Sequence, residues 1–272
     1  MKNLIYIIFI CLSVFNCEEV VELNLKTSEQ KLVIDASLGW IKNTNGKTQF
    51  IKLSLTAPYY DTSVPPATGA VVKVTDTKNN TFEFIEEENT GIYRNFNFIP
   101  EINGVYTLTI LYNNEIYTGT ETLMPVVPIE YVEQKNDAGF SGEDTEIKAY
   151  YTDPANTKNY YLFEYVNTNA NELNIDVYDD EFTDGNRIFA FQSYEDLKSG
   201  DELIIKNHGI SKQHFEYMSI LLQQNDDNNS GDPFQTQPTT IRGNCINQTN
   251  PDNFPLGYFR VSEVSTFRYI VN

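Results

Sequence analysis

The sequence predicts a mainly β protein, with an N-terminal immunoglobulin-like β-sandwich followed by a second β-rich domain that carries one late helix. The chain has 18 Tyr and 17 Phe but one Trp among its 272 residues, and aromatic residues, like the many Thr, Val and Ile, favour strands. Short alternating runs separated by turn residues fill residues 32–123, which is typical of a sandwich. Convincing helical periodicity appears once, after residue 211.

The run 49–56 is the clearest strand of the first domain. Ile51, Leu53 and Leu55 alternate with more polar residues, which indicates a strand with one buried face. The Asn-Gly pairs at 45–46 and 103–104 tolerate positive φ and predict turns. With this strand, the sandwich is expected to consist of seven short strands, the others near 32–38, 70–76, 81–85, 91–93, 105–110 and 115–120.

Two prolines, Pro125 and Pro128, mark a predicted boundary, because closely spaced prolines disfavour both helix and central strand. Residues 32–124 then form the first domain and 125–272 the second, and a fragment 22–124 is expected to fold by itself. Strands of the second domain are expected at 129–133, 146–152, 160–167, 173–178 and 187–191. Its helix spans 211–224, capped by Ser211, with an apolar face made of Phe215, Met218, Ile220, Leu221 and Leu222.

Residues 1–16 have the features of a signal peptide. Lys2 precedes an apolar run of twelve residues at 4–15, which is shorter than the roughly 20 residues that span a bilayer. Cys17, followed by two glutamates, resembles the lipidation site of a bacterial lipoprotein signal, although such signals prefer a small residue where this chain has Asn16. We therefore expect lipid on Cys17 and a tether over residues 17–31, and a plain signal peptide remains the alternative. The glutamates of the tether are either a surface-export signal or an ordinary solvated linker.

The mature chain is strongly acidic. Without residues 1–16 it loses one lysine and keeps 18 Lys and Arg against 38 Asp and Glu, a formal charge of −20. Such a charge repels nucleic acids and anionic lipids, so we expect no nucleic-acid partner. Membrane affinity would have to come from acyl chains. Cys245 is then the one cysteine left, which excludes an intramolecular disulfide.

Several motifs occur together in this chain. They are the lipoprotein signal, the segment 31–35 (Lys-Leu-Val-Ile-Asp), the Pro-Val-Val-Pro-Ile hinge at 125–129, the late helix, and the tail segments 241–244 and 255–262, of which Leu-Gly-Tyr-Phe at 256–259 is the most specific. In this combination the chain resembles the DUF4249 family of Bacteroidetes lipoproteins. The resemblance implies an outer-membrane lipoprotein that accompanies a TonB-dependent transporter. It implies no catalytic residues. Cys245 departs from the family pattern, in which an aliphatic residue is more usual.

No catalytic motif or phosphate-binding loop is present, and no cofactor is expected. His208 and His214 lack a third ligand at zinc spacing and are expected to lie on the surface or in loops. Cys245 is expected to be a buried or half-buried thiol.

Asp226, Asn228 and Ser230 follow the spacing of the first ligands of a calcium-binding loop, but position twelve is Gln237 instead of Glu. A second acidic loop, 180–185, has Phe182 where a ligand belongs; for both loops a polar surface turn is the alternative.

Two functions are compatible with these features. The first is a non-catalytic, lipid-anchored protein on the surface of the outer membrane, which binds a ligand or serves as an accessory component of a TonB-dependent transporter. The second is an envelope hydrolase that acts on glycans or peptides through carboxylate chemistry. The first accounts for the signal, for the lack of catalytic motifs and for the family resemblance. A substrate screen separates the two.

Overall fold

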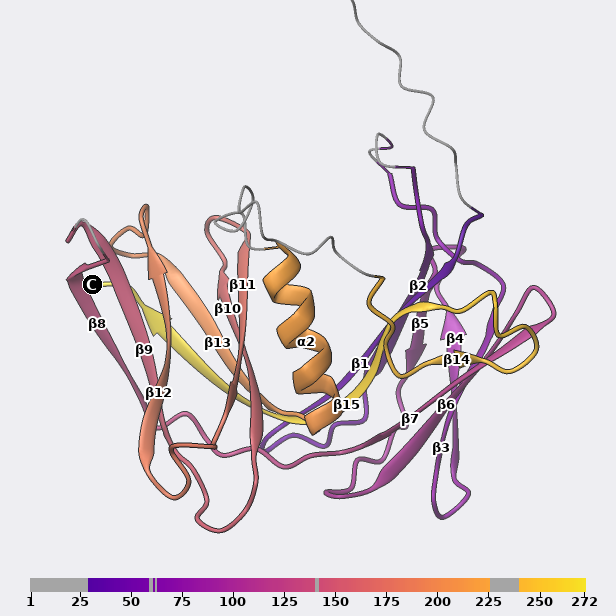
Figure 1. Cartoon of the computed structure of the whole chain (residues 1–272), viewed down its shortest axis with the longest axis horizontal. Coiled ribbons are helices and arrows are strands. Elements are labelled where there is room, and N and C mark those ends of the chain that lie inside the picture. The colour runs from indigo at the N-terminus through magenta and orange to yellow at the C-terminus, as the bar shows by residue number, and fades with distance from the viewer. Residues whose placement is uncertain (1–28, 59–60, 62, 140–141, 226–239) are drawn as a thin grey trace, which may run out of the picture.

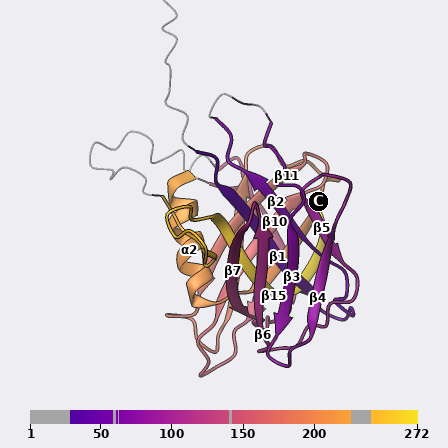
Figure 2. The ribbon, with the colours of Figure 1, turned by 90° about the vertical axis from the view of Figure 1, so that its right-hand side faces the viewer.

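The seven strands expected in the first half of the chain are all present in the computed structural model, which describes residues 29–58, 61, 63–139, 142–225 and 240–272 (Figure 1). They pack around one apolar core that includes Ile34, Ile51 and Tyr93. Figure 2 shows this sandwich from its outer side. The strands are β1 (Leu32–Ile41), β2 (Gln49–Leu55), β3 (Val71–Asp76), β4 (Thr81–Glu86), β5 (Ile92–Asn95), β6 (Val105–Tyr112) and β7 (Glu115–Thr122).

The second half folds into another layered unit with its own core. A three-stranded sheet in the order β12-β9-β8 supplies Ile147 and Tyr151, and the facing strands β10 and β13 supply Phe163 and Ile205. The strands of this half are β8 (Tyr131–Ala138), β9 (Asp144–Thr152), β10 (Tyr160–Asn167), β11 (Glu172–Asp179), β12 (Arg187–Tyr194) and β13 (Glu202–Gly209). Of these, β13 was not predicted from the sequence.

One long strand, β15 (Leu256–Ile270), joins the two units into a twelve-stranded sheet in the order β11-β10-β13-β15-β1-β2-β5-β4-β3-β6-β7-β14. Its first part runs parallel to β1, and its later part pairs antiparallel with β13. Neither β15 nor the short β14 (Ile246–Asn247), which extends the edge at β7, was predicted. Cys245, Phe259 and Val261 therefore belong to the first core. The predicted boundary at residue 125 does not enclose that core completely.

The predicted helix is present as α2 (Lys212–Asn225), and it lies between the two units (Figure 1). Ser211 caps it as expected, because its Oγ accepts a hydrogen bond from the His214 amide at 3.2 Å. Met218 is buried against Leu162 and Ile210. The prediction for Ile220 was wrong: it is 47% exposed, because the helix turns it away from the sheet. Within the described residues, no helix has the length and apolarity needed to cross a membrane.

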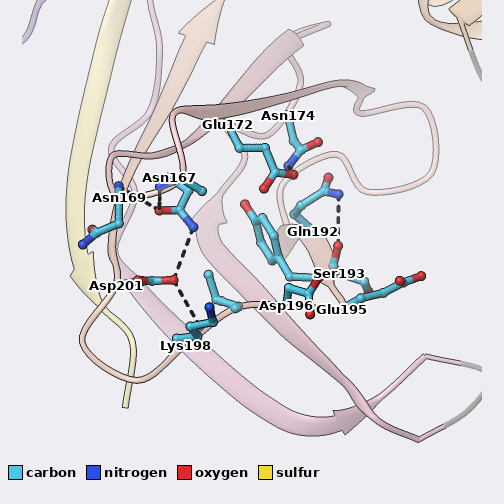
Figure 3. Close-up of a pocket in the computed structure, with 13 residues that line it drawn as sticks. Asn167, Asn169, Glu172, Asn174, Gln192, Ser193, Glu195, Asp196, Lys198 and Asp201 are labelled. Carbon is cyan, nitrogen blue, oxygen red and sulfur yellow. Dashed lines mark hydrogen bonds between the residues drawn. The ribbon is translucent and has the colours of Figure 1, made fainter.

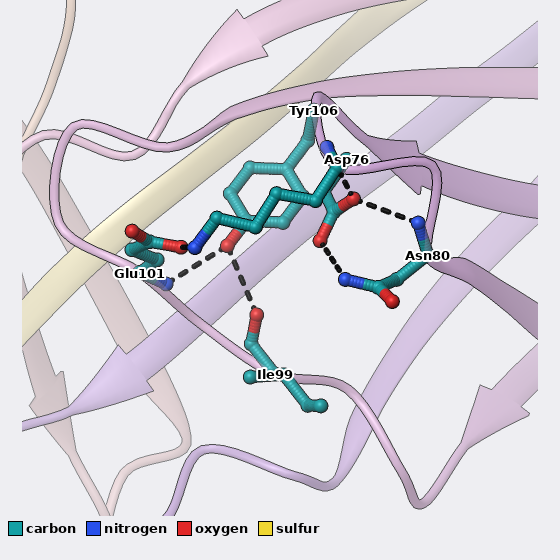
Figure 4. A network of polar contacts seen from close by, with 6 residues as sticks. Asp76, Asn80, Ile99, Glu101 and Tyr106 are labelled. Atoms are coloured by element: carbon teal, nitrogen blue, oxygen red, sulfur yellow. Dashed lines mark hydrogen bonds and ion pairs between the residues drawn. The ribbon is translucent and has the colours of Figure 1, made fainter.

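A buried tyrosine ties a loop to the first sandwich (Figure 4). The Tyr106 hydroxyl donates a hydrogen bond to the Ile99 carbonyl at 3.0 Å and accepts one from the Glu101 amide at 2.8 Å. A tyrosine near the start of a strand that reaches back to the backbone is a recurring feature of immunoglobulin-like folds, the tyrosine corner. Beside it, the Asp76 carboxylate accepts hydrogen bonds from Lys78 and Asn80 and closes the β3–β4 turn.

Candidate functional site

A cleft of about 550 Å³ opens between the two units, where β1, β2, β10, β13 and β15 present one sheet face and α2 covers part of it. Strand register explains why residues from distant parts of the chain meet there. Ser37 lies beside Arg260, and Glu164 lies beside Lys206. Because side chains alternate along a strand, the cleft is lined by every second residue of β1 from Asp35 to Ile41, and likewise by Leu162 and Glu164 of β10 and by Lys206 and His208 of β13. The charged and histidine side chains that line it are Asp35, Glu164, Lys206, His208, His214 and Arg260.

Glu164 is the centre of the charged cluster in this cleft. Its carboxylate lies 3.0 Å from Lys206 Nζ, 3.3 Å from His208 Nε2 and 3.7 Å from Arg260 Nη2. Burial alone would raise the pKa of Glu164, but the contact with His208 and the charges of Arg260 and Lys206 outweigh it and hold that pKa well below its usual range. Glu164 is thus a paired, ionised carboxylate at neutral pH.

Both histidines of the chain are buried in or beside this cleft, each only 4% exposed. The expectation of surface or loop histidines was therefore wrong, since His208 lies within β13 and His214 on the first turn of α2. Burial and the charge of Arg260 lower the pKa of His208 to about 4, and the same two effects lower that of His214 to about 2. Both imidazoles are neutral at pH 7. The His214 ring packs on Tyr258 at a centroid distance of 4.4 Å.

Arg260 is the buried cation of the cleft, with 8% of its surface exposed. Burial lowers its pKa, but an arginine remains charged in proteins. Its Nε and Nη1 atoms have no hydrogen-bond acceptor among the described residues, and the Nδ1 atoms of His208 and His214 lack partners there too. Unsatisfied buried polar atoms are uncommon in folded proteins and call for an explanation.

A second polar network holds the start of α2 on the sheet. The buried Glu121 carboxylate of β7 accepts hydrogen bonds from Ser211 Oγ at 2.9 Å and from the Tyr258 hydroxyl at 3.1 Å. Burial raises the pKa of Glu121. The network connects β7, β15 and the N-cap of α2, so it fixes the helix turn that carries His214.

Glu164, Lys206 and Arg260 were not predicted from the sequence as members of a site. They lie on three strands, β10, β13 and β15, and no local spacing connects them. One signal was available for two of them: Glu164 interrupts the apolar and aromatic run of β10, and Arg260 stands between Phe259 and Val261. A charge that is buried in this way needs a partner or a function.

Another cavity, of about 600 Å³, lies at the end of the second unit (Figure 3). Its polar groups bond mainly to one another. Asn167 Oδ1 accepts hydrogen bonds from the amides of Asn169 and Ala170, and Asp201 Oδ2 accepts them from Asn167 Nδ2 and the Lys198 amide. These contacts shape two loops, so this cavity is a weaker candidate than the cleft.

Of the site residues predicted from the sequence, some lie within the described part of the chain and others do not. Cys17 and the calcium candidates Asp226, Asn228 and Ser230 lie outside the described residues. In the other acidic loop, carboxylate oxygens of Asp180 and Asp184 lie with one of Asp153 within 4.8 Å of one another. Lys158 Nζ is 2.7 Å from Asp180 Oδ1, so an ammonium group already neutralises that carboxylate.

Cys245 is buried, as expected from the sequence. Its burial raises the pKa of the thiol to about 12, so the group is protonated at neutral pH. A thiolate is the reactive form of cysteine. Cys245 therefore contributes to the first core and has no reactive character.

Comparison with known proteins gives one family match. A family model described as "Domain of unknown function (DUF4249)" matches residues 18–268. No curated protein matches the chain. Solved structures resemble parts of it: a two-domain fibronectin type-III segment of chicken tenascin is 12% identical over 66% of this chain and 90% of that one, with a TM-score of 0.22. A DUF4785 family protein from Legionella pneumophila is 11% identical over 68% of this chain and 54% of that one, with a TM-score of 0.25.

Proposed function

The chain belongs to the DUF4249 family, and from this premise we propose that it is a non-catalytic lipoprotein of the outer-membrane surface that binds a ligand in the cleft between its two units. The observation that carries the proposal is the cleft itself. Its volume of about 550 Å³ falls in the range of about 300–1,000 Å³ that is typical of ligand pockets. Its wall holds buried polar atoms for which the described residues provide no partner.

The anchor supports the same function. Cys17 follows a signal-like apolar run, and lipid on that residue would hold the acidic body at a membrane that it does not attract electrostatically. We further propose that the protein accompanies a TonB-dependent transporter, as the family resemblance implies, and delivers or presents its ligand there. The transporter would be the protein partner.

The cleft favours binding over hydrolysis. A glycosidase needs a carboxylic acid that can donate a proton near neutral pH, which requires a raised pKa. Glu164 has the opposite property, because its neighbours keep it ionised. Its carboxylate is also shared among three nitrogen-bearing side chains. We therefore assign Glu164 a structural role in the cleft.

Membrane fractionation tests the location. Cells that express the full chain are grown with an alkyne-bearing fatty acid, and the outer membrane is separated and probed for labelled protein. We expect the wild-type protein to carry the label and to fractionate with the outer membrane, and Cys17→Ala to lose both. Cys245→Ala is the matched control, because it removes the other cysteine of the mature chain. A Cys17→Ala variant that stays in the outer membrane would refute the anchor.

Chemical crosslinking in the same cells tests the partner. A crosslinked product that contains the transporter is expected for the wild-type protein and not for Cys17→Ala.

The hydrolase alternative is tested with full-length protein in detergent, on a panel of polysaccharides and peptides. Turnover that disappears in Glu164→Gln would overturn the non-catalytic assignment.

A further inference from the structure

The cleft carries information about the chemistry of its ligand, because two cations on its wall, Lys206 and Arg260, are paired unequally. Lys206 Nζ lies 3.0 Å from a Glu164 oxygen, a normal ion-pair distance. Arg260 Nη2 lies 3.7 Å from the same carboxylate, which is too long for a good hydrogen bond. Glu164 therefore satisfies Lys206 and leaves Arg260 poorly paired.

Arg260 has donors to spare. A guanidinium has five N–H groups, and in this one neither Nε nor Nη1 meets an acceptor in the described part of the chain. Leaving a buried charged group without its hydrogen bonds is costly. An arginine that lines a cavity and retains free donors is suited to receive oxygen atoms of an anion, because hydrogen bonds between two charged groups are short and strong.

The remaining charges of the cleft limit the charge of that anion. Asp35 and Glu164 balance Lys206 and Arg260 formally, so a dianion would leave two uncompensated negative charges and a monoanion only one. The two imidazoles nearby are neutral and add no positive charge. A group with a single negative charge fits this balance best, and a carboxylate carries that charge on oxygen atoms that can accept hydrogen bonds from the unpartnered Arg260 donors.

From this geometry we infer that the cleft binds a ligand through a carboxylate group, which accepts hydrogen bonds from Arg260 while Lys206 remains paired with Glu164. This inference rests on the proposed binding role of the cleft. Arg260 is then the specificity residue, and the two histidines lie close to the bound group. The ligand class is an organic monocarboxylate, or a larger molecule that presents one carboxylate to the cleft.

The two histidines provide a direct probe of the cleft. The chain has only two, and both line the cleft, so protein labelled with ¹³C-histidine and made without a polyhistidine tag reports on the cleft alone. Acetate, acetamide, inorganic phosphate and glucose are each titrated into the full-length protein at pH 7 and constant ionic strength. We expect acetate to move both histidine signals in a saturable way, and acetamide, which has the same shape without the charge, to have no such effect.

A pair of arginine variants locates the contact. Arg260→Gln should weaken the acetate response about tenfold or more, as expected for loss of a charged hydrogen bond. Arg268→Gln is the control, since Arg268 lies on the same strand but is exposed and paired with Glu202. Thermal melting shows whether each variant is folded. If Arg260→Gln does not fold, the comparison of acetate with acetamide on the wild-type protein still decides.

The other outcomes separate this inference from the proposed function. Equal responses to acetate and acetamide, tighter saturation by phosphate, or an unchanged acetate response in Arg260→Gln would overturn the carboxylate assignment. Saturable shifts with glucose alone would overturn it as well, but would leave a ligand-binding cleft. No response to any of the four probes would contradict both.

Discussion

At the scale of single residues, the buried polar atoms of this molecule are of two kinds. Some have all their hydrogen bonds within the protein and stabilise the fold, whereas others lack partners and are suited to bind a ligand. Tyr106 has both of its hydroxyl hydrogen bonds satisfied by backbone groups. Arg260 and the two histidines have nitrogen atoms without a partner among the described residues. The first arrangement stabilises the fold, and the second leaves interactions available to a ligand.

The Tyr106 hydroxyl should contribute measurably to stability. Tyr106→Phe leaves the ring in the core but removes an acceptor from the Glu101 amide and a donor to the Ile99 carbonyl. We expect a loss of about 1–3 kcal/mol in the free energy of unfolding, measured by urea denaturation. Tyr112→Phe on the same strand is the control, because it removes a hydroxyl from a partly buried ring that packs against the same core. Equal losses in the two variants would contradict the tyrosine corner.

The buried histidines should make stability fall in acid. Each is neutral when folded, with a pKa of about 4 for His208 and about 2 for His214, against about 6.5 when unfolded. The unfolded chain therefore binds more protons below pH 6.5, and stability rises with pH over that range. By pH 4 each histidine should have removed about 3 kcal/mol of the stability present at pH 7.

His214→Gln isolates one of these contributions. The variant should lose less of its stability than the wild-type protein between pH 7 and pH 4, when the melting temperature is measured at each pH. The informative quantity is the difference between the two proteins in the stability lost from pH 7 to pH 4. Glu121 and Asp153 have raised pKa values, so they add stability as the pH falls, but they do so equally in both proteins. Parallel pH profiles for the two proteins would show that His214 is not buried as described.

At the scale of secondary-structure elements, α2 depends on a contact that its own sequence does not reveal. Ser211 caps the helix and also donates a hydrogen bond to the buried Glu121 carboxylate. Ser211→Ala should therefore lower the free energy of unfolding by more than the roughly 1 kcal/mol that a lost helix cap costs, because the Glu121 carboxylate also loses a hydrogen-bond donor. Ser219→Ala, which removes only a hydroxyl bond to the Phe215 carbonyl of the same helix, should change stability by less than about 0.5 kcal/mol. Similar losses in the two serine variants would mean that the contact with Glu121 adds nothing.

The sequence predicted elements whose signal is local and missed those whose signal is not. The strands of the first sandwich alternate and are joined by turns with Asn or Gly, as in the run 49–56. β15 does neither. Eight consecutive residues, 258–265, are buried, and they include Arg260 and Glu263. A strand that is enclosed on both faces and carries polar groups lacks the period of two on which such predictions rest.

The cleft was beyond prediction for a related reason. Glu164, Lys206 and Arg260 are brought together by the pairing of β10 with β13 and of β13 with β15. Each of these pairings joins segments far apart in the sequence, and two of the three strands were not predicted. The capped helix and the burial of Cys245, by contrast, depended on local residue chemistry and were predicted.

At the scale of the whole molecule, β15 connects the two units. Residues 256–264 pair with β1, and residues 264–270 pair with β13. Phe259 and Val261 fill the first core, while Val271, just beyond the strand, fills the second. A single strand whose two parts complete different cores should make the unfolding of one unit disturb the other.

We therefore expect the full chain to unfold in one cooperative transition, and the fragment 29–124 to be much less stable than the predicted domain boundary implies. That fragment leaves β1 without its β15 partner and removes Cys245, Phe259 and Val261 from the core. Joining residues 242–264 to it through a flexible linker should restore a cooperative transition, measured by calorimetry and near-ultraviolet circular dichroism. The same linked fragment with Phe259→Ala is the control, because loss of this fully buried ring should cost about 3–5 kcal/mol. A cooperative transition in 29–124 alone, unchanged by the added strand, would show that the first sandwich folds independently of β15.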